Sequence, residues 1–564
     1  MNGKDQHTYD AIVIGSGMSG GMAAMELCRR GLKTLVLERG PLVKHGDYPT
    51  ATLDDWDFEY GNRVPDAVQK KHYWSLSRKQ YIMQESDVHH FVRDSDYPFT
   101  ERRRFDWMRS YQTGGRSLTW GRHCYRLSDL DFEANAREGI GIDWPIRYAD
   151  LKPWYDYVQR FVGVSGRVEN RANFPDGPFL PPMELNCVET KLRDGVHAKW
   201  PDRLVSEGRV AHLTAYDPEV HGEGRGNCRY RDRCRRGCPY GGYYSSNSGA
   251  LAAADRTGNL TLRPDAAVRE IIYDKDQKRA TGVRVKLTDE GKETEYFVTG
   301  PLFLCASALN SAAILLQSTS DAMPNGLGNA SDQVGRNVMD HHHRIGASAE
   351  FPGMEDQYYK GRKPNGFYIP RFVNLGKDSK RDYLRGFGYQ GGGARGNWRS
   401  LVRELTPGPG FREALTAPGP WTMGMTGFGE CLPNPDNRVT VNYDLLDKDG
   451  LPTLTMDVAF GENERKMRKD MPVFAAEMLE AAGGRNVREF ATEAFPGFSV
   501  HEMGTARMGR DPKTSVLNKH NQVWDCPNLY VTDGAAMTSA GCVNPSLTYL
   551  ALTARAVAHA TETK

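Results

Sequence analysis

The hydrophobic pattern near the N-terminus predicts a strand, a helix and a second strand in succession. Residues 9–14, Tyr-Asp-Ala-Ile-Val-Ile, are rich in β-formers and stop at glycine, as buried parallel strands do. A helix is expected from about Gly17 to Gly31, and the apolar residues 32–38 predict the second strand. This β-α-β unit has about 30 residues, the usual length for one half of a nucleotide-binding sheet.

Composition and hydrophobic pattern change several times along the rest of the chain. Residues 45–112 are charged, aromatic and irregular, and we expect them to form a long excursion over a bound ligand. Residues 215–345 return to strand and helix patterns, residues 346–497 are rich in glycine, proline and aromatic residues, and residues 498–564 are compact again. The glycine run 391–393 predicts a mobile loop.

Composition and charge exclude several classes of protein. The 564 residues are 39% hydrophobic and 26% charged, which is ordinary for a globular protein of more than one core. With 73 basic and 71 acidic residues the net charge is +2, so no global field would recruit nucleic acid or an anionic membrane. No run of about 18 apolar residues predicts a transmembrane segment. We expect no export signal, because the N-terminus has no basic region followed by an apolar region and a cleavage site.

The turn after the first strand carries a dinucleotide fingerprint, GSGMSG at 15–20. Gly15 permits the tight turn, Gly17 lets the backbone approach a pyrophosphate, and Gly20 lets helix and strand pack closely. The helix N-terminus then offers free N–H groups to the phosphates. Glu38, 18 residues after Gly20, can hold ribose hydroxyls. The pattern alone separates NAD from FAD poorly, although its place at the N-terminus favours FAD.

A second group of candidate residues lies near the C-terminus. Residues 547–561 have helical spacing, which makes Pro545 the expected first helical residue and Asn544 the expected N-cap. His501 is the natural base for removing a hydroxyl proton, because an imidazole titrates in the useful range. Each residue also has a plainer interpretation, Asn544 as a simple cap and His501 as a buried histidine bonded to a carbonyl.

These motifs, taken in order, resemble those of the glucose–methanol–choline (GMC) oxidoreductases over nearly the whole chain. The resemblance rests on the fingerprint with Glu38, TGGRSLTW at 113–120, CASALNSAAILL at 305–316, VGRNVMDH at 334–341, and finally His501 and Asn544-Pro545. It implies an α/β fold, α+β overall, with a Rossmann-like FAD-binding domain and a discontinuous substrate domain that contains an antiparallel sheet. We assign residues 1–135, 215–345 and 498–564 to the first domain and residues 136–214 and 346–497 to the second.

The resemblance also implies roles for individual residues. In the family, the residues that match His501 and Asn544 flank the flavin N5 and act on the substrate hydroxyl, so both are expected to be catalytic. Val268 matches a position near the adenine and Asp533 one near the ribityl chain and phosphates. The full set of expected FAD-binding residues is Gly15, Gly17, Ser19, Gly20, Glu38, Arg39, Gly114, Gly115, Ser117, Thr119, Val268, Asp533, Asn544 and Pro545.

One departure from the pyranose-oxidase branch of the family concerns flavin attachment. Those relatives carry a histidine in a Ser-Thr-His-Trp motif that bonds covalently to the flavin. The matching position here is Thr119, in Ser117-Leu118-Thr119-Trp120. We therefore expect non-covalent FAD, with His123 as a weaker candidate for attachment.

Three clustered cysteines, Cys228, Cys234 and Cys238, suggest a redox or metal centre. Thiolates at this spacing can converge on a 3Fe–4S cluster, bind zinc with a fourth ligand such as His221, or remain structural thiols. The spacing resembles that of FAD glucose dehydrogenase catalytic subunits, a GMC subgroup in which a 3Fe–4S cluster relays electrons to a cytochrome. Five neighbouring arginines could tune such a cluster, dock an acidic partner, or simply be solvated: Arg229, Arg231, Arg233, Arg235 and Arg236.

The whole pattern is most similar to bacterial glucoside 3-dehydrogenase catalytic subunits. This implies oxidation of a sugar or glycoside hydroxyl at C3, a small accessory subunit that bears a twin-arginine signal, and a periplasmic or membrane-associated location, with a cytoplasmic one as the alternative. Aromatic residues of 346–400 suit stacking on sugars, although they could equally form core: Tyr358, Tyr359, Phe367, Tyr368, Phe387, Tyr389 and Trp398. Two other activities stay open, an oxidase that makes hydrogen peroxide and a GMC-type lyase without net redox turnover.

Overall fold

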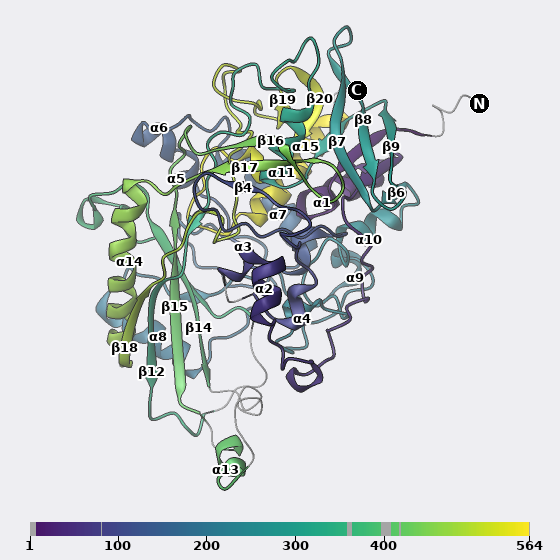
Figure 1. The fold of residues 1–564 in the computed structure, drawn as a ribbon. Coiled ribbons are helices and arrows are strands. Elements are labelled where there is room, and N and C mark those ends of the chain that lie inside the picture. Colours follow the sequence, from purple (N-terminus) through teal and green to yellow (C-terminus); the bar gives the residue numbers. More distant parts are fainter. Residues whose placement is uncertain (1–6, 80–81, 358–363, 396–407, 417–418, 563–564) are drawn as a thin grey trace.

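A mostly parallel sheet carries the fingerprint loop. The computed structural model describes residues 7–79, 82–357, 364–395, 408–416 and 419–562 (Figure 1). The sheet has the order β19-β20-β10-β2-β3-β6, in which only the β19–β20 pair is antiparallel. Every residue of β2 and β3 is buried, as expected for strands covered on both faces. Its strands are β2 (Ala11–Ile14), β3 (Thr34–Leu37), β6 (Leu260–Arg263), β10 (Leu302–Leu304), β19 (Gln522–Val523) and β20 (Cys526–Val531).

The expected β-α-β unit is present, with slightly different ends. Helix α1 (Met18–Arg29) follows β2 and packs against α15 (Ser546–Glu562) and α10 (Ala250–Asp255). The predicted first strand is divided at Asp10, because β1 (Thr8–Tyr9) pairs with a second sheet of order β1-β9-β8-β7. The other strands of that sheet are β7 (Ala266–Asp274), β8 (Arg279–Leu287) and β9 (Lys292–Val298).

A large antiparallel sheet forms the other half of the molecule. Its order is β18-β12-β15-β14-β13-β5, with β11 added beside β15. Helices α8 (Cys187–Lys199) and α14 (Glu462–Ala481) pack on it, and the apolar side chains between them form a second core (Figure 1). The strands are β5 (Ser206–Glu207), β11 (His341–His342), β12 (Ile345–Phe351), β13 (Phe367–Ile369), β14 (Phe387–Arg395), β15 (Trp421–Glu430) and β18 (Arg485–Ala491). The predicted α/β class with an antiparallel sheet is thus confirmed, while the domain boundaries stay a prediction.

The remaining elements are a small sheet and several helices, of which α7 packs on α15. A fourth sheet has the order β16-β17-β4, with strands β4 (Thr100–Glu101), β16 (Arg438–Leu446) and β17 (Pro452–Asp457). The helices are α2 (Asp66–His72), α3 (Trp74–Ser77), α4 (Glu85–Val88), α5 (Asp129–Phe132), α6 (Ala134–Glu138), α7 (Tyr148–Val162), α9 (Pro218–His221), α11 (Ala308–Gln317) and α13 (Phe411–Thr416). Within the described part of the chain, no helix is long and apolar enough to span a membrane.

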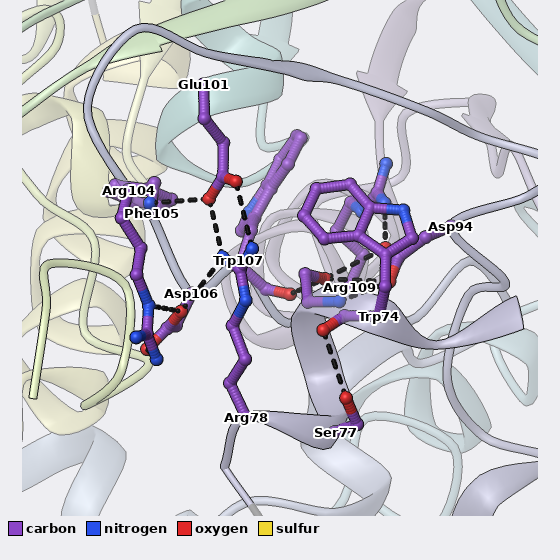
Figure 2. A network of polar contacts seen from close by, with 11 residues as sticks. Trp74, Ser77, Arg78, Asp94, Glu101, Arg104, Phe105, Asp106, Trp107 and Arg109 are labelled. Carbon is purple, nitrogen blue, oxygen red and sulfur yellow. Dashed lines mark hydrogen bonds and ion pairs between the residues drawn. The ribbon is translucent and has the colours of Figure 1, made fainter. Parts of the chain in front are cut away.

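Ion pairs hold the excursion at 45–112, whose helices and strand are short. Figure 2 shows Arg78 between two carboxylates, 2.8 Å from Glu101 and 3.3 Å from Asp106. Arg109 pairs with Asp94 at 2.7 Å, and both side chains are almost fully buried. Removing one partner of such a pair would leave an uncompensated buried charge, so these contacts fix the path of the segment.

The expectation of a mobile loop at 391–393 is wrong. Gly391, Gly392 and Gly393 do not form a mobile loop but lie within β14, paired with β15. Of the two interpretations given for the aromatic residues, the structure supports core for four of them, which are buried: Phe367, Tyr368, Phe387 and Tyr389. The other aromatic candidates, Tyr358, Tyr359 and Trp398, lie outside the described residues.

The glycine run allows α8 to pack closely on the sheet. A Cβ atom at Gly393 would lie 2.1 Å from Cγ2 of Val188, a fully buried residue of α8, whereas a Cβ at Gly424 in β15 would meet no atom within 4 Å. We predict that Gly393→Ala lowers the free energy of unfolding by about 1–3 kcal/mol through overpacking. The matched Gly424→Ala should change it little. Urea unfolding measures both, and equal stability of the two variants would contradict the packing argument.

Candidate functional site

One cavity brings together segments from both ends of the chain and from the excursion. It lies at the carboxyl ends of β2 and β3, where ligands bind in open parallel sheets. The predicted residues that line it are Gly15, Gly17, Ser19, Glu38, Arg39, Gly115, Ser117, Val268, His501, Asp533, Asn544 and Pro545. Gly20, Gly114 and Thr119 lie outside this lining. A Cβ at Gly20 would stand 1.9 Å from the Gly15 carbonyl oxygen, so this glycine serves helix packing.

The fingerprint loop has the shape that a dinucleotide requires. Gly15 has a φ of +93°, which favours glycine, and a Cβ there would lie 2.4 Å from the Cys305 carbonyl oxygen. A Cβ at Gly17, by contrast, would meet no protein atom within 4 Å. Since Gly17 borders the cavity, its missing side chain leaves room for a pyrophosphate at the start of α1. The residues present therefore fit FAD.

Glu38 and Arg39 are both fixed by other protein groups. The Glu38 carboxylate accepts hydrogen bonds from Ser16 Oγ at 2.5 Å and from Gly40 N at 3.0 Å. Burial raises its pKa, and the hydrogen bond from Ser16 partly opposes that rise. The Arg39 guanidinium lies over the rings of Tyr97 and Tyr111, at 5.0 and 4.6 Å, which ties the excursion to the cavity wall.

Further predicted cofactor residues have defined partners. Asp533 accepts hydrogen bonds from Ser311 Oγ at 2.6 Å and Ala535 N at 2.9 Å, and burial raises its pKa to about 6. Ser117 Oγ donates to the Gly114 carbonyl at 2.6 Å. His123 also lines the cavity, and its Nδ1 lies 2.9 Å from the Tyr125 hydroxyl. Burial lowers the pKa of His123 to about 3, so its ring is neutral.

The two predicted catalytic residues lie together at the cavity wall. His501 Nε2 is 3.4 Å from Asn544 Nδ2, and Asn544 Oδ1 accepts a hydrogen bond from Gln390 Nε2. The predicted cap at α15 is wrong by one residue, because the helix begins at Ser546 and Pro545 O accepts the first-turn bond from Tyr549 N. The Asn544 amide is therefore committed to His501 and Gln390 rather than to the helix end.

The surroundings of His501 keep its imidazole uncharged. Burial lowers its pKa well below the usual 6.5, and the neighbouring His341 and His343 add to that effect. Burial likewise lowers the pKa of His341 to about 4 and that of His343 to about 3. At neutral pH His501 is consequently in the form that accepts a proton.

Charged residues that the sequence did not reveal lie behind His501. Asp340 accepts from the backbone N–H of His501 at 3.0 Å and of Ser499 at 3.1 Å, and burial raises its pKa to about 6. Lys79 Nζ donates to the carbonyl oxygen of Phe498 at 2.9 Å, and burial lowers its pKa to about 8. Arg116 pairs with Glu502 at 2.8 Å. Asp340 and Arg116 lay inside recognised motifs, but their partners are distant in sequence.

The three clustered cysteines are half-buried free thiols on one loop. Burial, with smaller contributions from the nearby Cys234 and Cys238, raises the pKa of Cys228 to about 11. Among the described residues, no group of three or more His, Cys, Asp or Glu side chains is placed to hold a metal ion. The cluster and the zinc site therefore stay predictions.

The arginines around these cysteines are mostly paired with the excursion. Arg235 lies 3.2 Å from Asp87 and Arg236 lies 3.1 Å from Asp55, while Arg233 pairs with Asp54. These contacts attach the cysteine loop to residues 54–87. The arginines thus have a structural role that the sequence alone left open.

Comparisons with known proteins agree with this geometry. Residues 213–343 and 433–553 each match a family model described as GMC oxidoreductase, and residues 10–46 match an FAD binding domain. The chain is 29% identical to 2-methyl-1,2-propanediol dehydrogenase of Mycolicibacterium austroafricanum, over 97% of this chain and 94% of that one. It is 26% identical to the fructose dehydrogenase large subunit of Gluconobacter japonicus, over 97% and 96%. A structure of Aspergillus oryzae formate oxidase superimposes with a TM-score of 0.61 at 14% identity, covering 99% of this chain and 98% of that one.

The fold, the cavity and these matches define an FAD-dependent oxidoreductase that acts on CH–OH groups. The chain belongs to the GMC oxidoreductases.

The open space at Gly17 gives a test of the cofactor site. We predict that Gly17→Ala leaves the stability of the apoprotein unchanged, because the new methyl group meets no protein atom within 4 Å. It should remove most bound FAD, because the methyl group occupies the space expected for the pyrophosphate. Flavin absorbance per chain and thermal unfolding of the apoprotein measure the two effects. Gly20→Ala is the contrasting control, since its methyl group meets the Gly15 carbonyl and should destabilise the fold itself. Full FAD content in Gly17→Ala would argue against a pyrophosphate at this loop.

Proposed function

We propose that this protein oxidises a secondary hydroxyl of a sugar or glycoside to a ketone and passes the electrons to an external acceptor. The hydroxyl we propose is the one at C3 of a glucoside. The observation that carries the proposal is the pair His501 and Asn544, 3.4 Å apart at the wall of the cavity that also contains the dinucleotide fingerprint. The names of two relatives, fructose dehydrogenase and paromamine 6'-oxidase, support a sugar-like substrate. The choice of C3 rests on the resemblance to glucoside 3-dehydrogenases.

The roles of the residues follow from their contacts. Bound FAD supplies the acceptor for the hydride of the carbinol carbon. His501 Nε2 takes the hydroxyl proton, a contribution of about 10²–10⁴ in rate for a well-placed base. Asn544 turns its NH₂ group toward His501 because its Oδ1 already accepts from Gln390, so the second N–H can hold the substrate oxygen.

Thr119 offers no imidazole for attachment, so we propose that FAD is non-covalent and that acid precipitation of the protein releases it.

The proposal is tested by anaerobic flavin reduction in a stopped-flow spectrophotometer. Methyl β-D-glucoside should bleach the flavin, and deuterium at C3 should slow the bleaching several-fold, because the C3–H bond is broken. The same glucoside deuterated at C2 is the matched control and should react at the unlabelled rate. An isotope effect with deuterium at another carbon would show that this carbon, and not C3, is oxidised. No bleaching by the glucoside, fructose or 1,2-propanediol would contradict the function, and would favour the lyase alternative.

An oxidase remains the second candidate, because no group of three or more His, Cys, Asp or Glu side chains in the described part of the chain is placed to hold a metal ion. The finer proposal of a 3Fe–4S relay rests on their spacing alone, and iron analysis decides it. The relay proposal expects about three iron atoms per chain, slow reoxidation of the reduced enzyme in air and fast reoxidation by a quinone. An iron-free protein that reoxidises rapidly in air and yields peroxide would instead be an oxidase with structural thiols.

We also propose a small accessory subunit that bears the export signal, and a periplasmic location that follows from it. The name of the fructose dehydrogenase large subunit supports a multi-subunit assembly. Fractionation of cells that express the chain with and without a candidate small subunit that carries a twin-arginine signal gives the test. Recovery in the cytoplasm in both cases would remove this part of the proposal.

A further inference from the structure

We infer that His341 is a positioning residue that holds His501 in the tautomer with an unprotonated Nε2. The inference rests on the proposed function and adds a residue to its machinery. His341 Nδ1 lies 2.8 Å from His501 Nδ1, and His341 Nε2 lies 2.8 Å from the carbonyl oxygen of Gly541. The two rings meet edge to face, with centroids 5.0 Å apart and planes at 86°.

The carbonyl of Gly541 determines where the proton of His341 lies. A carbonyl oxygen only accepts hydrogen bonds, so His341 Nε2 must carry a hydrogen and donate it. A neutral imidazole has one N–H, which leaves Nδ1 of His341 as a bare acceptor. Burial of this ring, which lowers its pKa to about 4, keeps it neutral across the physiological range.

The tautomer of His501 follows from that of His341. Because His341 Nδ1 can only accept, the 2.8 Å contact requires that His501 Nδ1 carries the hydrogen. His501 is neutral as well, so its Nε2 is bare and faces the cavity.

The opposite end of the same chain of hydrogen bonds leads to the same assignment independently. Gln390 Nε2 donates to Asn544 Oδ1, so the side of Asn544 that faces His501 Nε2 is its NH₂ group. This group can only donate, and His501 Nε2 must therefore accept. All bonds then point one way, from Gln390 through Asn544, His501 and His341 to the Gly541 carbonyl.

The backbone explains why the two imidazoles meet. Met339 and Met503 exchange two hydrogen bonds of 2.9 Å, so the segments that carry His341 and His501 lie side by side. Strand β11 alternates its side chains, which directs His341 toward His501 and the next residue, His342, toward Phe460 on the other side. His342 is consequently a natural control on the same strand.

The test compares three variants of the FAD-loaded enzyme by anaerobic flavin reduction with methyl β-D-glucoside. His341→Leu removes the acceptor for His501 Nδ1, and we expect the limiting rate to fall about 10- to 100-fold, by analogy with the loss of the hydrogen-bond partner of a metal-binding histidine. The glucoside concentration for half-maximal rate should change little. In His341→Asn the side-chain oxygen lies near the former Nδ1 and can still accept, so most of the rate should return. His342→Leu should react like the wild type.

The outcomes separate this inference from the proposed function. If the wild type is bleached but His341→Leu stays within twofold of it, or His341→Asn is as slow as His341→Leu, the inference is wrong and the function stands. If His342→Leu is as slow as His341→Leu at equal FAD content, the effect belongs to the strand and the inference is also wrong. If no glucoside, fructose or 1,2-propanediol bleaches the wild type, the function falls and the inference with it.

Discussion

The hydrogen bond between two buried, uncharged imidazoles, His341 and His501, is the contact on which the active site depends. It joins a short strand beside the large antiparallel sheet to the C-terminal segment that returns to the parallel sheet. It requires a neutral His341, because a protonated His341 would place its Nδ1–H against the Nδ1–H of His501. Burial secures that condition by penalising the charged form of every histidine in the group.

Buried charges surround this neutral pair and hold its backbone. Asp340 accepts from the N–H groups of Ser499 and His501, and Lys79 donates to a carbonyl oxygen in the same turn. Charges so deeply buried persist only with partners of opposite sign or with several hydrogen bonds. The proton acceptor, His501, is thus uncharged, while the charged residues Asp340 and Lys79 hold its backbone in place.

Local features were predictable from the sequence. The strand, the glycine turn, the helix and Glu38 lie within residues 9–38, where spacing alone fixes the geometry, and the structure places them as expected. His501 and Asn544 were also found, because their motifs are short and ordered along the chain. Helix α15 followed from periodicity, although its first residue did not, since the Asn544 side chain is drawn to Gln390 instead of the helix end.

Long-range pairings could not be predicted. His341 and His501 are separated by 160 positions, and Gln390 and Asn544 by 154, so no local pattern reports their contact. The glycine run 391–393 looks like a loop because the sequence does not show that α8 needs its space. The cysteine spacing likewise gives the separation of the thiols along the chain but not the direction in which each thiol points. Tertiary packing determines the long-range contacts, the conformation of the glycine run and the directions of the thiols.

The protonation state of His501 is the central claim, and nitrogen NMR of enzyme labelled with ¹⁵N-histidine measures it directly. His501 and His341 signals would be assigned by their loss in His501→Asn and His341→Asn, at neutral pH and with FAD bound. We expect His501 to show a protonated Nδ1 and a bare Nε2, and His341 to show the reverse. A protonated His501 Nε2, in either the neutral or the charged ring, would contradict the account.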